Sequence, residues 1–420
     1  MKILYVIGAF GPRYLANEIN RELVQEWSGR GHTCLIYAGV TPAELEGDPV
    51  SYWDGHVMVY RQLCEPRGRH RLTAGLGRAL FRYPRFLPLL GGLRRLLAHD
   101  PDIDVIHVEA VYPLGTMAAL AAIGHRAVLV PSIQGGDLID YPGYGYARFP
   151  LLRHLIRWTF RRATLVRANS PLMAQRAGAL GCAAAKLREV PVNIGDRFFL
   201  EKAPLAERRA EARADVRRRL GLEPEGPLVL STGRLLPLKG FHDLVAATAI
   251  LARQHPKVRV LIAGPNFVDP RLGDQRRALQ ESIERLGVQD QVRLLGTLEH
   301  ESEMPAYLAA ADFVVAAAHI EGMNKVVPEA GSQGTPAIVS RTTGVASSVE
   351  SWAAGLVVEP RDVPALAEAM IRMIADPMER ERMGRNALEM SRRFRVSVVA
   401  EQLIDLYSSA LERVGSEGRS

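Results

Sequence analysis

Short apolar runs alternate with amphipathic segments along almost the whole chain. The runs lack internal polar alternation, which is typical of strands that are covered on both faces in a parallel sheet. Strands are predicted at residues 2–8, 33–38, 105–108, 127–131, 165–168, 228–232, 258–263, 292–294, 313–316 and 337–340. Helices are predicted at residues 17–30, 150–163, 205–220, 241–255, 274–286, 305–311, 326–333 and 394–411. This order predicts an α/β fold with doubly wound, Rossmann-like parallel sheets.

The strand–helix alternation forms two series with a highly charged segment between them. One hydrophobic core stops growing at roughly 250–300 residues, so a chain of 420 residues is expected to have two domains. We place the N-terminal domain at residues 1–195 plus about 392–420, a linker at 196–227 and the C-terminal domain at 228–391. Because open parallel sheets bind ligands at the carboxyl ends of their strands, the two domains are expected to face a cleft.

The composition is that of an ordinary globular protein, with 47% apolar and 24% charged residues. A net charge of +7 suits an anionic ligand, an anionic membrane surface or nucleic acid, and does not choose among them. Cys34, Cys64 and Cys182 are far apart and odd in number, which favours free thiols in a reducing compartment. No signal peptide or membrane-spanning run is apparent, so we expect a cytoplasmic protein, soluble or peripheral on the inner face of the membrane.

A first candidate site follows the strand at residues 228–232, in the stretch STGRLLPLKGF. Gly233 ends the strand, Arg234 comes directly after it, and Lys239 precedes the next helix. An arginine fork, a lysine charge and the positive end of a helix are together suited to bind a diphosphate. One arginine and one lysine on a loop can equally be solvated, so this motif alone does not decide the function.

A second candidate site is the stretch HIEGMNKVVPEA, which joins a strand to a helix. One glutamate precedes the helix and a second lies in its first turn. Carboxylates accept hydrogen bonds from sugar and ribose hydroxyls, and the free amides at the helix start can bind a phosphate or sugar oxygen. The alternative for the second glutamate is a favourable interaction with the helix dipole only. The candidate residues here are Glu321, Gly322, Met323, Asn324, Lys325, Val326 and Glu329, and Gly11 and Gly264 complete the candidate donor-binding set.

Together, the stretches GRLLPLKG, EGMNKVVPEAGSQGTPAIVS and GTLEHESEMPAYLAAADFVV resemble the family 4 retaining glycosyltransferases of the GT-B fold. The resemblance extends over nearly the whole chain, and the pair of glutamates is its most specific part. It implies that Glu321 contacts the donor sugar, Glu329 the ribose, and Arg234 and Lys239 the donor diphosphate. It also implies a nucleotide-diphosphate sugar as co-substrate, no cofactor, no metal ion, and a C-terminal helix that crosses back onto the N-terminal domain. We take Glu321, Arg234 and Lys239 as the catalytic candidates.

The N-terminal half resembles this family less closely. Its first loop contains Gly11 but lacks the pair of glycines that many relatives carry near the donor phosphates. Where relatives have His-Gly-x-Asp, this chain has Gln-Gly-Gly-Asp. We take Gln134, Gly135, Asp137 and Tyr141 as candidates for the acceptor or sugar side. Tyr141 begins an aromatic loop that could stack on an acceptor ring or simply anchor the surface.

Arginine is concentrated in residues 61–95 and 151–167, where aromatic and aliphatic residues are interleaved and acids are almost absent. Such segments can dock on anionic lipid headgroups, and a docked protein would have a lipid or lipid-linked acceptor within reach. The alternative is that arginines cover amphipathic helices that pack normally. No recognised nucleic-acid motif accompanies the charge, so nucleic acid is not an expected partner.

The expected function is metal-independent, retaining transfer of a hexosyl group from a nucleotide sugar to a hydroxyl of a glycan, lipid-linked or small-molecule acceptor. UDP-sugar is the favoured donor and GDP-sugar the next. Two alternatives stay open: a nucleotide-sugar epimerase on the same fold, and a non-catalytic binding relative, which Gln134 and the missing glycine pair would suit. A dehydrogenase is disfavoured because no GxGxxG follows the first strand.

Overall fold

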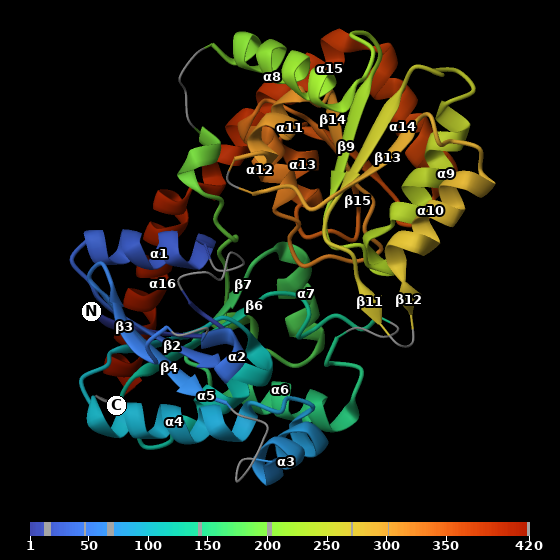
Figure 1. Cartoon of the computed structure of the whole chain (residues 1–420). Coiled ribbons are helices and arrows are strands. Elements are labelled where there is room, and N and C mark those ends of the chain that lie inside the picture. The colour runs from blue at the N-terminus through green and yellow to red at the C-terminus, as the bar shows by residue number, and fades with distance from the viewer. Residues whose placement is uncertain are drawn as a thin grey trace. The chain divides into compact units, whose positions relative to one another are not determined.

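The computed structural model describes residues 1–11, 18–45, 48–64, 71–141, 145–199, 204–269, 272–300 and 302–417. The chain divides into two compact units, Met1–Asn193 with Val396–Ser420, and Ile194–Arg395. We call them unit 1 and unit 2 (Figure 1). No helix in the described ranges is both long and apolar enough to cross a membrane.

Unit 1 is built on an eight-stranded sheet with the order β3-β4-β2-β1-β5-β6-β7-β8. All neighbouring strands are parallel except β3 and β4, which pair antiparallel at one edge. The strands are β1 (Lys2–Ile7), β2 (Thr33–Val40), β3 (Ser51–Asp54), β4 (Val57–Leu63), β5 (Val105–Val108), β6 (Val128–Ile133), β7 (Val166–Ala168) and β8 (Leu187–Glu189). The five strands predicted for this half are confirmed, and β3, β4 and β8 are additional.

Helices cover both faces of this sheet. They are α1 (Glu18–Gly29), α2 (Pro42–Leu45), α3 (Arg71–Phe81), α4 (Phe86–His99), α5 (Thr116–Ala121), α6 (Pro150–Arg162), α7 (Pro171–Ala179) and α16 (Val396–Glu417), with the short turns η3 (Val111–Gly115) and η4 (Ala184–Lys186). Alternate residues of β1 enter different cores, because successive strand side chains point to opposite faces. Tyr5 packs with Trp27 of α1, whereas Leu4 and Val6 pack with Phe86 of α4.

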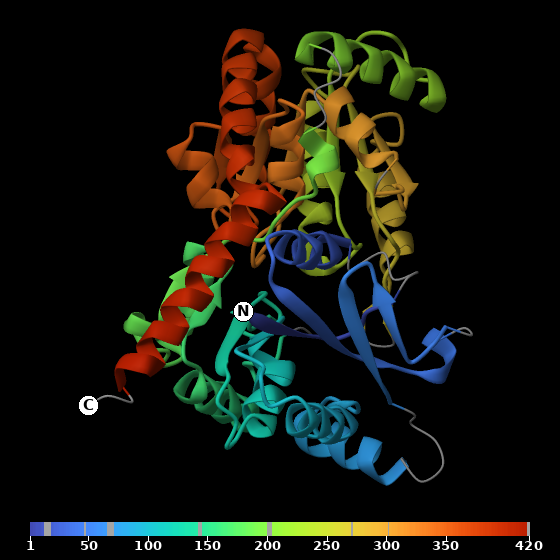
Figure 2. The same ribbon diagram turned by 90° about the vertical axis from the view of Figure 1, so that its left-hand side faces the viewer.

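Helix α16 belongs to unit 1 although it is the last element of the chain (Figure 2). It packs against α1 and β6, and the hydroxyl of its Tyr407 lies 2.7 Å from Nδ1 of the buried His107. The predicted return of the C-terminal helix is therefore confirmed. The helix continues to Glu417, six residues beyond the predicted end at 411, and residues 418–420 lie outside the described residues.

Unit 2 contains a six-stranded, fully parallel sheet with the order β13-β10-β9-β14-β15-β16. Its strands are β9 (Leu228–Thr232), β10 (Arg259–Ala263), β13 (Val292–Gly296), β14 (Phe313–Ala316), β15 (Ala337–Ser340) and β16 (Gly355–Val358), and β11 (Val268–Asp269) pairs with β12 (Gly273–Asp274). Because β9 lies between β10 and β14, the loops after these three strands emerge side by side at one edge of the sheet.

The helices of unit 2 surround this sheet. They are α8 (Leu205–Leu220), α9 (Phe241–Leu251), α10 (Gln275–Arg285), α11 (Met304–Ala310), α12 (Val326–Ser332), α13 (Ala346–Ser351), α14 (Val363–Ala375) and α15 (Pro377–Ser391), with the short turns η5 (Asp196–Phe199), η6 (Pro237–Lys239) and η7 (Arg392–Phe394). The sequence pattern predicted β9, β10, β13, β14 and β15 and the helices from α8 to α12 at nearly these positions, whereas β11, β12, β16 and the helices α13 to α15 were not predicted.

Residues 196–227, predicted as a linker, lie within unit 2. Their helix α8 packs against α11 (Figure 1). Arginine side chains attach it to the rest of the unit. Arg209 donates to the carbonyl of Ala311 at 2.7 Å, and Arg213 pairs with Asp312 at 2.9 Å. Burial lowers the pKa of Arg209 to about 10. The sequence suggested a linker here because the buried contacts of this helix are made by charged residues.

Candidate functional site

Three glycines allow the loops after β9, β10 and β14 to approach one another closely. Gly233 and Gly264 have φ values of +149° and +152°, and a Cβ on Gly264 would overlap the carbonyl of Gly233. Gly240, at φ +70°, ends η6 in the left-handed region, and a Cβ there would overlap the carbonyl of Ala317. Such positions accept only glycine without strain. The segment that contains both predicted cations is thus fixed between two neighbouring loops.

The two predicted cations differ in their surroundings. The ammonium group of Lys239 forms an ion pair with the carboxylate of Glu321, and their side chains are 17% and 23% exposed. Arg234 is exposed, and none of the described residues accepts a hydrogen bond from its side chain. The structure therefore brings Lys239 and Glu321 together from loops far apart in the sequence, and leaves the guanidinium of Arg234 available beside them in the same loop.

The segment between the two glutamates has an unusual backbone. The N–H of Glu321 donates to Thr342 at 3.1 Å, and its carbonyl accepts from Gly344 at 3.0 Å. Asn324 has φ +71°, in the left-handed region that asparagine tolerates better than most residues. In the described part of the chain, the N–H groups of residues 323–325 find no acceptor. These donors precede α12, as the sequence suggested.

Glu329 lies in the first turn of α12 with only 5% of its side chain exposed. Its Oε1 lies 3.1 Å from Nε2 of His300. Burial alone would raise the pKa of Glu329, but the hydrogen bond from His300 and the positive charges of Lys325 and Arg197 lower it below its ordinary value. The carboxylate is therefore kept ionised inside the fold.

His300 connects Glu329 to the start of unit 2. The guanidinium of Arg197 lies 3.0 Å from Nδ1 of His300, and the ring of Phe198 packs edge-on against the imidazole. Because a guanidinium can only donate, Nδ1 accepts and the Nε2–H donates to Glu329. The hydrogen bond to Glu329 raises the pKa of His300, and burial and Arg197 oppose that rise.

His300 and Arg197 were not among the predicted site residues. His300 occurs in the quoted stretch GTLEHES, but nothing in its spacing connects it with a carboxylate 29 positions later. The pairing of this histidine with a buried glutamate becomes visible only in the three-dimensional structure.

A pH dependence follows from this pair. The raised pKa of His300 means that its charge stabilises the fold below the ordinary histidine pKa of 6.5, and that this contribution is lost as pH rises through the folded value. The lowered pKa of Glu329 gives a contribution present above 4.5 and lost as pH falls through its folded value. We expect the unfolding free energy of the wild type to exceed that of His300→Gln more at about pH 5.5 than at about pH 8. Denaturant titrations at both pH values test this, and an equal difference would contradict it.

The candidate residues in unit 1 are buried or half-buried. Asp137 is buried, and its carboxylate accepts from the backbone N–H groups of Val111 and Gly135 at 2.9 and 3.0 Å. Burial raises the pKa of Asp137 to about 6, although these bonds oppose the rise. The described bonds of Asp137 thus hold the turn that contains Gly135, at φ +116°. Gln134 beside this turn is half-buried.

The remaining unit 1 candidates border segments outside the described residues. Gly11 is buried and its carbonyl accepts from Arg21 at 3.1 Å, but the rest of the predicted first loop, residues 12–17, lies outside them. Tyr141 is half-buried, and residues 142–144 of its aromatic loop are likewise outside. The three cysteines are free thiols, as predicted, and burial raises the pKa of Cys34 to about 12.

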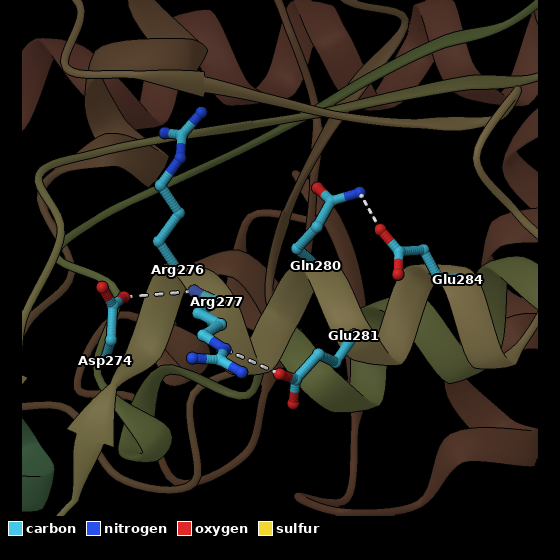
Figure 3. Close-up of a pocket in the computed structure, with 6 residues that line it drawn as sticks. All are labelled: Asp274, Arg276, Arg277, Gln280, Glu281 and Glu284. Carbon is cyan, nitrogen blue, oxygen red and sulfur yellow. Dashed lines mark hydrogen bonds and ion pairs between the residues drawn. The ribbon is translucent and has the colours of Figure 1, made fainter.

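A surface hollow along α10 contains none of the candidate residues (Figure 3). Its lining consists of Asp274, Arg276, Arg277, Gln280, Glu281 and Glu284. Arg277 pairs with Glu281 at 2.9 Å and Gln280 with Glu284 at 3.1 Å, both one helical turn apart. Such exposed pairs are typical of a solvated helix face. Across the described ranges, no group of three or more His, Cys, Asp or Glu side chains is placed to hold a metal ion.

Two family models match the chain and together span most of it. Residues 212–390 match the model of glycosyl transferases group 1, and residues 16–193 match that of the glycosyl transferase 4-like domain. The chain belongs to the family 4, or group 1, glycosyltransferases. In this glycosyltransferase the first match falls within unit 2 and the second within unit 1.

Individual relatives are more distant. The glycosyltransferase is 33% identical over 206 residues to the D-inositol 3-phosphate glycosyltransferase of Corynebacterium glutamicum, a match that covers 49% of this chain and about half, 48%, of that relative. It is 29% identical over 325 residues to the GDP-mannose-dependent alpha-(1-6)-phosphatidylinositol monomannoside mannosyltransferase of Mycolicibacterium smegmatis, covering 74% of this chain and 79% of that protein.

Among solved structures, the glycosyltransferase is similar to HepE of Anabaena, determined in complex with UDP. The TM-score is 0.74 with 22% identity, over 97% of this chain and 100% of that one. This likeness establishes the fold as GT-B, with two Rossmann-like units and a C-terminal helix that returns to the first, as the sequence predicted.

Proposed function

We propose that this glycosyltransferase moves a sugar from a nucleotide-diphosphate donor held by unit 2 to a hydroxyl acceptor held by unit 1. The observation that carries the proposal is the Lys239–Glu321 ion pair, formed at the carboxyl ends of β9 and β14 beside the exposed Arg234. A cation and a carboxylate at this edge match the two ends of a sugar diphosphate, one anionic and one rich in hydroxyls.

In the proposed reaction, the bond between the anomeric carbon and the diphosphate oxygen breaks while the acceptor oxygen bonds to the same face of that carbon. The acceptor proton passes to the departing phosphate oxygen, so no side-chain nucleophile is required. Lys239 and Arg234 stabilise the negative charge that develops on the diphosphate. Because these two side chains supply positive charge there, we propose that no metal ion is needed.

The acidic residues would orient the donor. Glu321 would exchange its bond with Lys239 for sugar hydroxyls when Lys239 turns to the diphosphate. The N–H groups of Met323, Asn324 and Lys325 would donate to sugar or phosphate oxygens, and their lack of acceptors among the described residues supports this role. Glu329, held ionised by His300, would accept from the ribose hydroxyls.

For the donor base we propose uridine first and guanosine second. HepE was solved with UDP, whereas the mannosyltransferase relative is named for GDP-mannose, so both belong in any test. For the acceptor we propose a hydroxyl of a glycan or of a lipid-linked sugar. The lipid option is supported by the arginine-rich surface of unit 1 and by the relative whose name includes a phosphatidylinositol mannoside.

A thermal-shift series tests the donor assignment, since a ligand that binds only the folded state raises its stability. We expect one UDP- or GDP-sugar to raise the melting temperature, and the shift and subsequent turnover to persist in excess EDTA. Nuclear magnetic resonance of the product should show an anomeric configuration equal to that of the donor. A product of inverted configuration would contradict retention, and an epimerised free donor would point to an epimerase instead.

Turnover separates transfer from mere binding. If the donor binds but no acceptor or water consumes it, the chain is the non-catalytic binder that a glutamine at position 134 would suit. Restoring a histidine by Gln134→His would then be the informative variant, because histidine can carry a charge at that position and glutamine cannot.

A further inference from the structure

Helix α3 presents an apolar stripe to solvent. Leu72, Leu76 and Leu80 are 79%, 51% and 50% exposed and follow one another at intervals of four residues. That spacing places them on one face of the helix. The only residue that α3 buries is Gly77, where a Cβ would come within 2.8 Å of the carbonyl oxygen of Tyr83. The helix therefore packs on the unit through its glycine face and turns its leucines outward.

The surroundings of this stripe are positively charged. No aspartate or glutamate occurs from Arg71 to His99. Arg71 and Arg78 are exposed and, being seven residues apart, share a face beside the leucines. The guanidinium of Arg82 lies 3.8 Å from the ring centre of Phe149 and so joins the end of α3 to the start of α6. There, Leu151 adds a further apolar side chain, 58% exposed.

We infer that α3 is an interfacial helix that docks unit 1 on an anionic phospholipid bilayer, with Leu72, Leu76 and Leu80 inserted among the acyl chains. A helix with an apolar stripe flanked by arginines is the arrangement that lies in the plane of a membrane surface. Both views show α3 at the outer edge of unit 1 (Figures 1 and 2). This inference goes beyond the proposed sugar transfer and does not depend on it.

A lipid surface fits the stripe better than a second copy of the chain. A two-fold dimer through α3 would place the same patch against itself and bring its arginines together without any acid of this segment to offset them. Anionic headgroups supply the missing negative charge along the whole helix, and the hydrocarbon accepts the three leucines without requiring a matching pocket.

Vesicle flotation of the full chain tests the inference. Phosphatidylcholine vesicles with about one-third phosphatidylglycerol should carry the wild type at low salt, and phosphatidylcholine alone should not. The triple variant Leu72→Ser, Leu76→Ser, Leu80→Ser should lose at least tenfold in affinity. Arg71→Gln and Arg78→Gln should each weaken binding about fivefold, and added salt should weaken the wild type. Since all five side chains are exposed, thermal unfolding should be unchanged.

A matched control removes three exposed apolar side chains elsewhere. Val268→Ser, Leu286→Ser, Met378→Ser changes residues of unit 2 that are 68%, 39% and 82% exposed, and should float like the wild type. Equal flotation of the α3 variant and the wild type would overturn the inference, as would equal binding to both vesicle types. A wild-type dimer that the α3 variant abolishes would show a second copy to be the occupant. If the protein floats with the vesicles but binds no nucleotide sugar, the proposed sugar transfer is wrong and the membrane-docking inference is still supported.

Discussion

Lys239→Met is expected to lower kcat/KM for the nucleotide sugar about a hundredfold. Its ammonium is the partly buried cation of the β9 loop and the partner of Glu321. A hydrogen bond to a charged group is worth about 1.5–3 kcal/mol, and each 1.36 kcal/mol lost from transition-state stabilisation is tenfold in rate. The loss should fall mainly on kcat, because the charge of the leaving diphosphate is largest in the transition state. Steady-state kinetics with the donor identified by thermal shift measure it.

Lys257→Met is the matched control for that variant. Lys257 also lies in unit 2, but its side chain is 74% exposed and only 3.7 Å from an exposed carboxylate, that of Glu225. Such surface pairs contribute little, so this variant should keep wild-type kinetics. If Lys239→Met and Lys257→Met have the same kcat/KM, Lys239 has no part in transfer. A large rise in KM with kcat unchanged would instead assign Lys239 to binding the donor equally in the ground and transition states.

Glu329→Gln is expected to weaken donor binding by about tenfold to a hundredfold and to destabilise the fold by about 1–3 kcal/mol. The amide keeps the volume of the carboxylate but removes the charge that pairs with His300 in a site where only 5% of the side chain is exposed. The neutral group also accepts less strongly from ribose hydroxyls. Calorimetric titration with the nucleoside diphosphate measures the affinity, and denaturant unfolding measures the stability.

Two comparisons separate the roles of Glu329. His300→Gln should reproduce part of the destabilisation, and the double variant should cost less than the sum of the single ones, because the residues are in contact. Glu350→Gln changes an exposed glutamate of the same unit and should affect neither quantity. Unchanged nucleoside diphosphate affinity in Glu329→Gln would restrict this carboxylate to a structural role.

Much of the local geometry around the candidate site in unit 2 could be predicted from local sequence. The loop after β9 is recognisable in the sequence because Gly233 and Gly240 permit backbone conformations that few other residues adopt. The two cationic residues, Arg234 and Lys239, lie next to these glycines. The two glutamates were recognisable because strand and helix periodicity fixed the turn between them. The interaction partner of each glutamate could not be predicted from the sequence. Glu321 pairs with Lys239 and Glu329 with His300, and each pair joins loops that follow different strands.

Strand β4 was not predicted, and helix α8 was predicted only as part of a linker. Both misjudgements have one cause, which is that the buried contacts of these elements are not apolar or not on both faces. Strand β4 alternates buried and half-buried residues at the sheet edge, so it gives no continuous hydrophobic run. Helix α8 is rich in arginine and acid, and its attachment to unit 2 depends on guanidinium bonds such as that of Arg209 to Ala311. Pattern reasoning assumes that burial means hydrophobicity, and both segments depart from that assumption.

The return of α16 to unit 1 has a consequence for the order in which the chain is made. Leu403 and Tyr407 complete the same cluster as Trp27, although the two groups are separated by the whole of unit 2. A ribosome releases β1 and α1 early, but the face that α16 covers stays open until α16 itself emerges. Unit 2 is contiguous and can fold as it leaves the exit tunnel. Premature termination before Val396 would therefore spare unit 2 and leave the nascent unit 1 as a target for chaperones.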